Sequence, residues 1–326
     1  MTWLNHGDHS LQGKTVVITG ASRGIGAEIS QLFAKNGANL IGIARSEQPL
    51  GHWAKSMEEL GIQATGIAFD LSNLEQLPTL AEKIERCAKD FCQQTSARSP
   101  VSAPASASNS VDILINNAGI EIYRAFQDYT LEDIEQVIRV NLLAAMGLTR
   151  LLLPMLSPQG QIINMASLAS KKGHPYDSAY AASKAGLLMW NHSLRQELER
   201  VGVSVSAICP GYVVDRGMLA NTGVKAPWLA GRSQAYTVAK AVLKAACDRP
   251  AEVIVNQDPV TELLTRVLLA LEQLFPRLAD VSNNWLGITR LNQQRIEYGM
   301  EHGTEHGISK SKKAEARSVT EPLVPR

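Results

Sequence analysis

The N-terminal part of the chain alternates between short apolar runs and helically spaced apolar positions. Runs of β-branched and other apolar residues predict buried strands at 14–19, 39–44 and 63–69. Apolar residues at helical spacing predict helices at 24–36 and 74–92. Strands that alternate with helices are typical of right-handed β-α-β units, so we expect this part of the chain to form a parallel sheet.

The same alternation continues after residue 110. Thr130, with Asp133 three residues later, is a suitable N-cap for the next helix. Strands are predicted at 111–115, 161–165, 203–208 and 252–256, and helices at 131–156, 178–201 and 235–247. The sequence therefore predicts one α/β domain over 13–257, with a doubly wound, seven-stranded parallel sheet and helices on both faces.

Residues 93–110 interrupt this pattern. The stretch (QQTSARSPVSAPASASNS) holds six serines, four alanines, two prolines and one charged residue. Such a composition cannot bury enough apolar surface to fold. We expect a flexible surface loop inserted into the domain, and a regulatory or docking role for it is the alternative interpretation.

An amphipathic segment follows the predicted sheet. Glu262, Arg266 and Glu272 lie opposite its apolar positions, and Pro276 breaks the helix. The apolar positions, at helical spacing, are Val260, Leu263, Leu264, Val267, Leu268, Leu271, Leu274 and Phe275. We expect a helical extension over 258–300, between a polar N-terminal tail (1–12) and a disordered C-terminal tail (301–326) at the two ends of the chain.

The apolar face of this extension has three interpretations. It covers the sheet edge or the substrate lid, forms a subunit interface, or lies on a membrane surface. A membrane-surface helix usually has a polar face rich in Lys and Arg, whereas this one mixes both signs. Packing against the same chain or a second subunit is therefore favoured, although peripheral membrane contact stays open.

Composition narrows the class of protein further. The net charge of +1 gives no reason to expect a nucleic-acid partner. Cys87, Cys92, Cys209 and Cys247 have neither CxxC spacing nor a histidine cluster, so we expect reduced thiols, no metal site and a cytoplasmic protein. Because residues 1–12 are polar and no apolar run reaches eighteen residues, we expect neither a signal peptide nor a membrane span.

Three side chains carry the chemistry that we expect. Tyr180 and Lys184 are four residues apart in a predicted helix, so both point to one face, and Ser167 precedes the tyrosine by thirteen residues. A cation beside a phenol favours the phenolate, so we expect Lys184 to lower the pKa of Tyr180. A phenol with a lowered pKa suits proton exchange with a carbonyl or an alcohol.

A glycine-rich turn lies between the first strand and the first helix. The run Gly20-Ala-Ser-Arg-Gly24-Ile-Gly26 permits a tight turn that brings the backbone close to a pyrophosphate at the helix N-terminus. The second strand ends at Ala44 and Arg45, where an acidic residue would favour NAD. Arg45 and Arg23 suit a 2′-phosphate instead, so we predict NADP rather than NAD.

These motifs together resemble the short-chain dehydrogenase/reductase family over roughly residues 12–257. The matching residues are Thr19-Gly20-x-x-x-Gly24-x-Gly26, Asp70, Asn116-Asn-Ala-Gly119, Asn141, Ser167, Tyr180-x-x-x-Lys184 and Pro210-Gly211. The resemblance implies a Rossmann-type domain whose active site lies at the carboxyl ends of the strands. Cofactor contacts are expected at Gly20, Ser22, Arg23, Gly24, Ile25, Gly26, Arg45, Asp70, Leu71, Asn117, Ala118, Gly119, Tyr180, Lys184, Pro210 and Gly211.

The resemblance also implies a role for each member of a catalytic group. Tyr180 would exchange a proton with the substrate oxygen as a hydride moves to or from the nicotinamide. Lys184 would bind the nicotinamide ribose, and Ser167 would polarise the carbonyl. Asn141 would position a water that links Lys184 to solvent.

The chain departs from the family pattern after Pro210-Gly211. The family often has a threonine four residues beyond this glycine, where this chain has Asp215. The segment 212–234 occupies the position of the substrate lid. Its apolar members, chiefly Tyr212, Met218, Leu219 and Trp228, point to a hydrophobic ketone or alcohol substrate.

The sequence therefore predicts an NADP-dependent oxidoreductase that acts on a carbonyl/alcohol pair and is a homodimer or homotetramer, as is common in the family. The alternative is a non-catalytic NADP-binding or sensor protein on the same fold. An epimerase or lyase with the same tyrosine and lysine fits less well, because its glycine loop usually has a different spacing.

Overall fold

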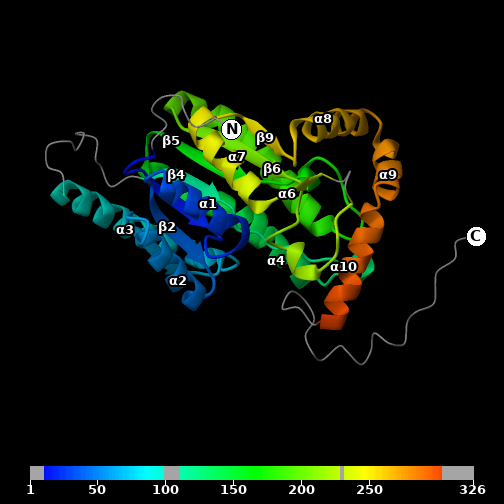
Figure 1. The fold of residues 1–326 in the computed structure, drawn as a ribbon, viewed down its shortest axis with the longest axis horizontal. Coiled ribbons are helices and arrows are strands. Elements are labelled where there is room, and N and C mark those ends of the chain that lie inside the picture. The colour runs from blue at the N-terminus through cyan, green and yellow to red at the C-terminus, as the bar shows by residue number, and fades with distance from the viewer. Residues whose placement is uncertain (1–10, 99–110, 228–230, 303–326) are drawn as a thin grey trace, which may run out of the picture.

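A seven-stranded parallel sheet forms the centre of the molecule (Figure 1). The computed structural model describes residues 11–98, 111–227 and 231–302. The sheet strands are β1 (Thr15–Thr19), β2 (Asn39–Ala44), β3 (Ala64–Ala68), β4 (Val111–Asn116), β5 (Leu156–Met165), β6 (Ser204–Pro210) and β9 (Glu252–Val255). This architecture confirms the predicted fold class.

The order of the strands fixes where a ligand can bind. The sheet runs β3-β2-β1-β4-β5-β6-β9 with every pair parallel, so the chain reverses its direction of winding between β1 and β4. The carboxyl ends of parallel strands at such a switch point open a crevice between the loops that follow them. The end of β1 and the end of β4 therefore face one site.

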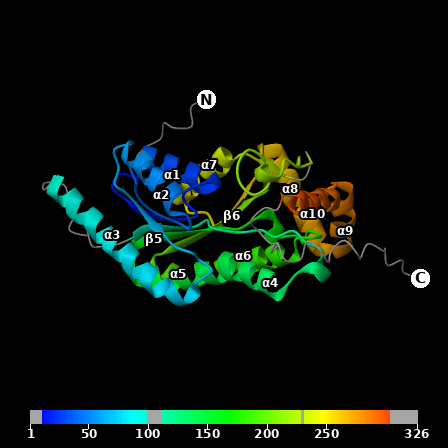
Figure 2. The same ribbon diagram turned by 90° about the horizontal axis from the view of Figure 1, so that it is seen from below.

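Helices cover both faces of the sheet, as Figure 2 shows. The helices α1 (Gly24–Lys35), α2 (Glu47–Glu58) and α7 (Ala235–Asp248) pack on one face. On the other face lie α3 (Leu77–Arg98), α4 (Leu131–Ile138), α5 (Ala144–Leu152) and α6 (Ser178–Leu198). Because both faces are covered, the strands are apolar almost throughout, with β1 buried at every position.

One helix was not predicted from the sequence. The α2 helix has Leu50, Trp53 and Met57 buried, but many of its other residues are exposed and Pro49 and Gly51 obscure its pattern. The ring of Trp53 lies directly over Gly42 of β2, where a Cβ would come within 2.4 Å of the ring. The packing of Trp53 on a strand position without a side chain thus stabilises a helix that the local sequence does not clearly predict.

The predicted flexible insertion begins later than residue 93. The α3 helix continues to Arg98, because extending an existing helix costs much less free energy than nucleating a new one. Residues 99–110, the rest of the predicted loop, lie outside the described residues, as do most of the two predicted tails.

The predicted helix at 131–156 is wrong in two respects. A π-helical turn at Arg139–Leu143 separates α4 from α5, and the helical stretch ends in a 3-10 turn at Leu153–Met155, where Pro154 cannot donate a backbone hydrogen bond. Leu156 already belongs to β5, whose pairing with β4 shifts register near its start. Thr130 does cap α4, in a capping box with Asp133.

Within the described part of the chain, the stretch Leu131–Met155 alone is long and apolar enough to cross a membrane. It lies in the helical layer below the sheet, where Leu148 and Leu152 pack into the core beside α3 (Figure 2). Packing into the protein core therefore accounts for part of its apolar composition.

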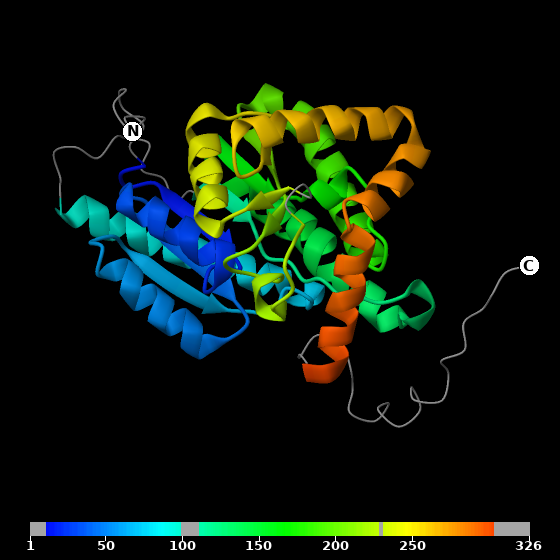
Figure 3. The same ribbon diagram turned by 45° about the vertical axis from the view of Figure 1, so that its right-hand side comes forward.

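Three helices beyond the sheet form the C-terminal extension, α8 (Pro259–Leu274), α9 (Pro276–Trp285) and α10 (Ile288–His302). They wrap around one end of the domain beside α6 and the β7–β8 segment (Figures 1 and 3). Strands β7 (Tyr212–Val213) and β8 (Arg232–Ser233) form a small parallel pair there.

The apolar face of α8 points to solvent, so the interpretation that this face covers the sheet edge or the substrate lid is wrong, whereas the interpretation that it forms a subunit interface stays a prediction. Val260, Leu263, Leu264, Val267, Leu271 and Leu274 are all exposed, and only Leu268 of the predicted set lines an interior cavity. The helix is oriented instead by Leu269 and Glu272, which are buried against the body. Leu269 joins an apolar cluster with Leu188 and Ile254, and Glu272 forms a buried ion pair with Lys172 at 2.7 Å.

Candidate active site

A large cavity opens at the carboxyl ends of the strands. Its volume is about 2910 Å³, enough for a dinucleotide together with a substrate. It is lined by every residue expected to contact the cofactor, from the glycine loop to Pro210 and Gly211, and by Ser167. The fold thus brings together segments that lie as far apart as Gly20 and Gly211 in the sequence.

The glycine loop is built for a close backbone approach. Gly20 and Gly24 have φ angles of +69° and +58°, which side chains disfavour. At Gly26 a Cβ would lie 2.0 Å from the carbonyl oxygen of Gly20, so only glycine fits where α1 meets the turn. This turn at a helix N-terminus matches the needs of a pyrophosphate.

Thr19 joins the glycine loop to the segment after β4. Its hydroxyl accepts hydrogen bonds from the backbone N–H of Asn117 at 2.9 Å and of Ala118 at 3.0 Å. The Asn117 amide donates to the carbonyls of Thr19 and Gly20. The two walls of the crevice are therefore held together before any ligand binds.

Arg23 and Arg45 both lie exposed on the cavity wall. Neither forms an ion pair with a described residue, so both guanidinium groups are free for an anionic ligand. Asp70 accepts the backbone N–H of Ser72 at 2.9 Å and lines the same cavity. The residues at this end fit a dinucleotide with an additional phosphate.

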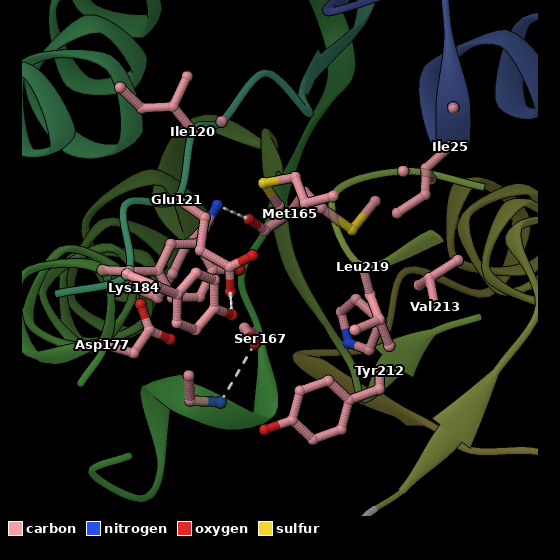
Figure 4. Close-up of a pocket in the computed structure, with 18 of the residues that line it drawn as sticks. Ile25, Ile120, Glu121, Met165, Ser167, Asp177, Lys184, Tyr212, Val213 and Leu219 are labelled. Atoms are coloured by element: carbon pink, nitrogen blue, oxygen red, sulfur yellow. Dashed lines mark hydrogen bonds between the residues drawn. The ribbon is translucent and has the colours of Figure 1, made fainter. Parts of the chain in front are cut away.

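Ser167, Tyr180 and Lys184 line the same cavity, in which Figure 4 shows Ser167 and Lys184. Tyr180 and Lys184 lie on one face of α6, with the Lys184 ammonium 5.8 Å from the centre of the Tyr180 ring. Ser167 ends the loop after β5, and its hydroxyl hydrogen-bonds to Tyr180. Lys184 donates to the carbonyl of Met165 at 2.7 Å, which fixes its position between the helix and the sheet.

The expected lowering of the Tyr180 pKa is wrong for this geometry. Burial, together with the carboxylates of Glu121 and Asp177, raises the pKa of Tyr180 well above its usual value, although the bond to Ser167 opposes the shift. Burial also lowers the pKa of Lys184 to about 8, so the ammonium form is less favoured here than in water. The spacing of Tyr180 and Lys184 predicted the position of the cation correctly. It did not predict the burial of the phenol or the carboxylates around it.

Asn141 lies behind the cavity rather than in its wall. It sits in the π-helical turn, accepts the Ile120 N–H at 2.8 Å and donates to the Ile120 carbonyl and the Ser183 hydroxyl. Its amide is therefore engaged by protein groups on every side. Asn141 thus holds the loop after β4 beside Gly119 and Lys184, and its expected role in positioning a water stays a prediction.

Asp215, the departure from the family pattern, has a clear structural partner. Its carboxylate accepts the backbone N–H of Ala235 at 2.8 Å, at the first turn of α7. The next residue, Arg216, pairs with Glu28 on α1 at 3.0 Å. These two contacts hold the start of the lid across the glycine loop.

The lid residues Tyr212, Met218 and Leu219 all line the cavity, whereas Trp228 lies outside the described residues. Tyr212 stacks on His174, with ring centres 6.2 Å apart. Burial and the nearby Lys172 lower the pKa of His174 to about 4, so this ring is neutral near pH 7.

Sequence reasoning left open whether the C-terminal extension covers the substrate lid, but it did not predict that the extension lines the cavity. The cavity is also lined by Leu268, Leu269, Leu286, Ile288, Arg295 and Ile296 from α8, the turn before α10, and α10. It missed Glu121 and Asp177 as well, which face Ser167 and Lys184 in Figure 4. The one available signal was the position of Glu121, two residues beyond the Asn116–Gly119 run.

The sequence model of the short chain dehydrogenase family matches residues 14–225, more than half of this chain. The chain belongs to this family. The match covers the glycine loop, the loop after β4 and α6, which are the elements that build the deep part of the cavity.

Similar proteins of this family include several reductases. The chain is 43% identical over 296 residues to ketoacyl reductase HetN of Nostoc sp., with 90% of this chain and 96% of the relative covered. It is 32% identical over 206 residues to 3-oxoacyl-(acyl-carrier-protein) reductase FabG of Vibrio cholerae, with 63% and 75% covered. Together with the family membership, these relatives identify the chain as an oxidoreductase that acts on CH–OH and keto groups.

Two solved structures of family members resemble the fold. A short chain dehydrogenase from Burkholderia cenocepacia in complex with NADP has a TM-score of 0.62 at 25% identity, covering 76% of this chain and 97% of that one. A metagenomic short-chain oxidoreductase in complex with NADP has a TM-score of 0.57 at 27% identity, covering 76% and 98%.

Proposed function

We propose that this protein transfers a hydride between NADP(H) and the keto/hydroxyl pair of a substrate with an apolar chain. The observation that carries the proposal is the continuity of one cavity, from Arg23 and Arg45 at one end to Tyr180 and Lys184 and then to apolar side chains of the extension. Bound NADP(H) supplies or accepts the hydride. The residues of the chain bind and orient the cofactor and the substrate, and they exchange the proton with the substrate oxygen.

Tyr180 is the proposed proton donor to the substrate oxygen. Its pKa, raised by burial, keeps the phenol protonated near neutral pH, which is the form needed for ketone reduction. Ser167, hydrogen-bonded to the same hydroxyl, orients it and offers a second hydrogen bond to the substrate oxygen. Lys184, held by the Met165 carbonyl, is placed to bind the nicotinamide ribose and to favour the phenolate once the proton has left.

The preference for NADP rests on Arg23 and Arg45. A 2′-phosphate would receive charge-assisted hydrogen bonds from guanidinium groups that have no carboxylate partner among the described residues. NADP in two structurally similar family members supports this choice. Replacing Arg45 with Gln should weaken NADPH relative to NADH by roughly 10–100-fold, since such a bond is worth about 1.5–3 kcal/mol.

The substrate proposal rests on the far end of the cavity. Leu268, Leu269, Leu286, Ile288 and Ile296 present apolar surface there. An acyl chain suits these walls, and two similar proteins are named as ketoacyl and 3-oxoacyl reductases. A 3-ketoacyl thioester is therefore the first substrate to test, with chains of increasing length.

The decisive experiment measures NADPH consumption with 3-ketoacyl thioesters and, for comparison, small keto acids. Tyr180→Phe should lower kcat by about 10²–10⁴-fold while NADPH binding is kept, because only the transferable proton is lost. Tyr236→Phe, which changes an exposed tyrosine on α7, is the matched control and should leave kcat unchanged. Equal, negligible turnover in the wild type and Tyr180→Phe would favour a nucleotide sensor instead.

A homodimeric or homotetrameric state and a cytoplasmic location stay predictions.

A further inference from the structure

A buried ion pair joins the C-terminal extension to the substrate end of the cavity. Arg295 on α10 donates through Nη2 to Oε2 of Glu121 at 2.8 Å, and the two side chains are only 3% and 10% exposed. The second guanidinium nitrogen, Nη1, donates to the hydroxyl of Tyr123, which in turn donates to Oε1 of Glu121. The guanidinium also lies 3.6 Å from the centre of the Tyr123 ring. Both carboxylate oxygens of Glu121 are thus held in place.

The backbone beside Glu121 is fixed as firmly as its side chain. The preceding residue, Ile120, has its N–H and its carbonyl both bound by the amide of Asn141. Glu121 therefore cannot move away from the proton-transfer group without breaking buried contacts. Figure 4 places it in the same cavity as Ser167, Asp177 and Lys184.

The charge of Glu121 acts on the proton-transfer group. Its carboxylate raises the pKa of both Tyr180 and Lys184, because a nearby negative charge disfavours the phenolate and favours the ammonium. Asp177 adds to the effect on Tyr180. Of the two carboxylates, Glu121 has the larger effect on Tyr180, and burial together with Glu121 raises the pKa of Asp177 itself well above its usual value.

Groups on neighbouring elements also act on Tyr180. Ser167, after β5, hydrogen-bonds to the phenol and lowers its pKa, and Tyr212 of β7 raises it. Lys184, on α6 itself, lies 5.8 Å from the ring. In this set of groups the strength of the Glu121 charge depends on its partner, Arg295.

We propose that Arg295 is a positioning residue of the reaction, which holds the Glu121 carboxylate, offsets its charge and so sets the pH range over which Tyr180 exchanges its proton. This inference rests on the proposed role of Tyr180. It assigns the extension a part in the chemistry, since α10 completes the electrostatic surroundings of a phenol on α6.

The charges fix the direction of each effect. Without Arg295, the uncompensated carboxylate of Glu121 stabilises the protonated phenol, so the pH at which Tyr180 loses its proton rises. Without Glu121, the uncompensated guanidinium stabilises the phenolate, so that pH falls. Removal of both groups restores a value between those of the two single variants. A buried charge shifts the pKa of a neighbouring group by on the order of one unit.

The test is the pH dependence of kcat/KM for alcohol oxidation with NADP⁺, which requires the phenolate and therefore rises through the pKa of Tyr180. Tyr180→Phe must abolish this rise in the full-length protein, which identifies the titrating group. The midpoint should move up by about one pH unit in Arg295→Gln, move down by about one pH unit in Glu121→Gln, and lie between these two values in the double variant. Arg266→Gln, which removes the guanidinium of an exposed pair on α8, is the control and should leave the midpoint in place.

Opposite shifts in the two single variants support the inference. A common shift, or midpoints equal to the wild type in both, overturns it while leaving the proposed function intact. If Arg295→Gln does not fold, the comparison is between Glu121→Gln and the double variant. The midpoint of Glu121→Gln should then lie below that of the wild type and below that of the double variant. A wild-type profile that Tyr180→Phe does not change would instead overturn the proposed function, and this inference with it.

Discussion

The ion pair between Lys172 and Glu272 gives the sharpest prediction on stability. The Lys172 ammonium lies 2.7 Å from Oε1 of Glu272, and the side chains are only 6% and 3% exposed. The Ser282 hydroxyl donates to the same oxygen. Lys172 belongs to the loop that precedes α6, whereas Glu272 is on α8, so this pair attaches the extension to the loop that leads to Tyr180.

Neighbouring contacts reinforce the same attachment. Asn283 of α9 donates to the carbonyl of Gly173 at 2.9 Å, and Asn292 of α10 donates to the carbonyl of Pro175 at 2.8 Å. All three helices of the extension therefore hold the loop before α6. The ion pair is the contact whose loss leaves a buried charge.

Lys172→Met leaves the Glu272 carboxylate buried without its cation. Breaking a buried pair in this way lowers the free energy of unfolding by about 3–5 kcal/mol. For a domain of this size, roughly 2–4 °C of melting temperature accompanies each kcal/mol, so the expected loss is roughly 6–20 °C. The double variant Lys172→Met/Glu272→Leu removes both charges and should lie within about 1–2 kcal/mol of the wild type.

Urea unfolding followed by circular dichroism measures these free energies, with kcat recorded on the same samples. The control is Arg266→Met, which breaks the exposed pair with Glu262 and should cost less than about 1 kcal/mol. A single variant as stable as the wild type would refute the reasoning. So would a double variant as unstable as Lys172→Met, because the loss would then come from packing rather than from the uncompensated charge.

Two further predictions concern the cofactor turn and Lys184. Gly26→Ala, whose Cβ would meet the Gly20 carbonyl at 2.0 Å, should weaken NADPH binding by at least about tenfold and cost about 1–3 kcal/mol in stability, as measured by fluorescence titration and urea unfolding. Gly51→Ala on α2, where a Cβ meets nothing within 4 Å, should do neither, and equal binding by both variants would contradict the tight-turn argument. Since burial lowers the pKa of Lys184 from 10.5 to about 8, the unfolded chain holds a proton that the folded chain lacks between these values, and stability should rise by about 3 kcal/mol across that window. Lys184→Met should lack this rise in urea unfolding at increasing pH, and an unchanged slope would show that another group titrates.

Local patterns predicted the parts of this protein that depend on neighbours in the sequence. The β-branched runs gave the sheet strands, because a strand buried on both faces must be apolar along its length. The turn at Gly20–Gly26 was readable because its backbone geometry requires glycine wherever it occurs. Periodicity failed at α2, where the packing of Trp53 on Gly42 rather than a regular pattern stabilises the helix.

The sequence by itself thus determined the sheet, the glycine turn and the pairing of Tyr180 with Lys184 on one helical face, since each follows from spacing within one segment. Only the tertiary structure decided the pKa of Tyr180 and the orientation of α8. Glu121, Arg295 and the Lys172–Glu272 pair come from segments more than 90 residues apart in the chain. Their electrostatic effect depends on distance and burial in three dimensions, which no spacing in the sequence encodes.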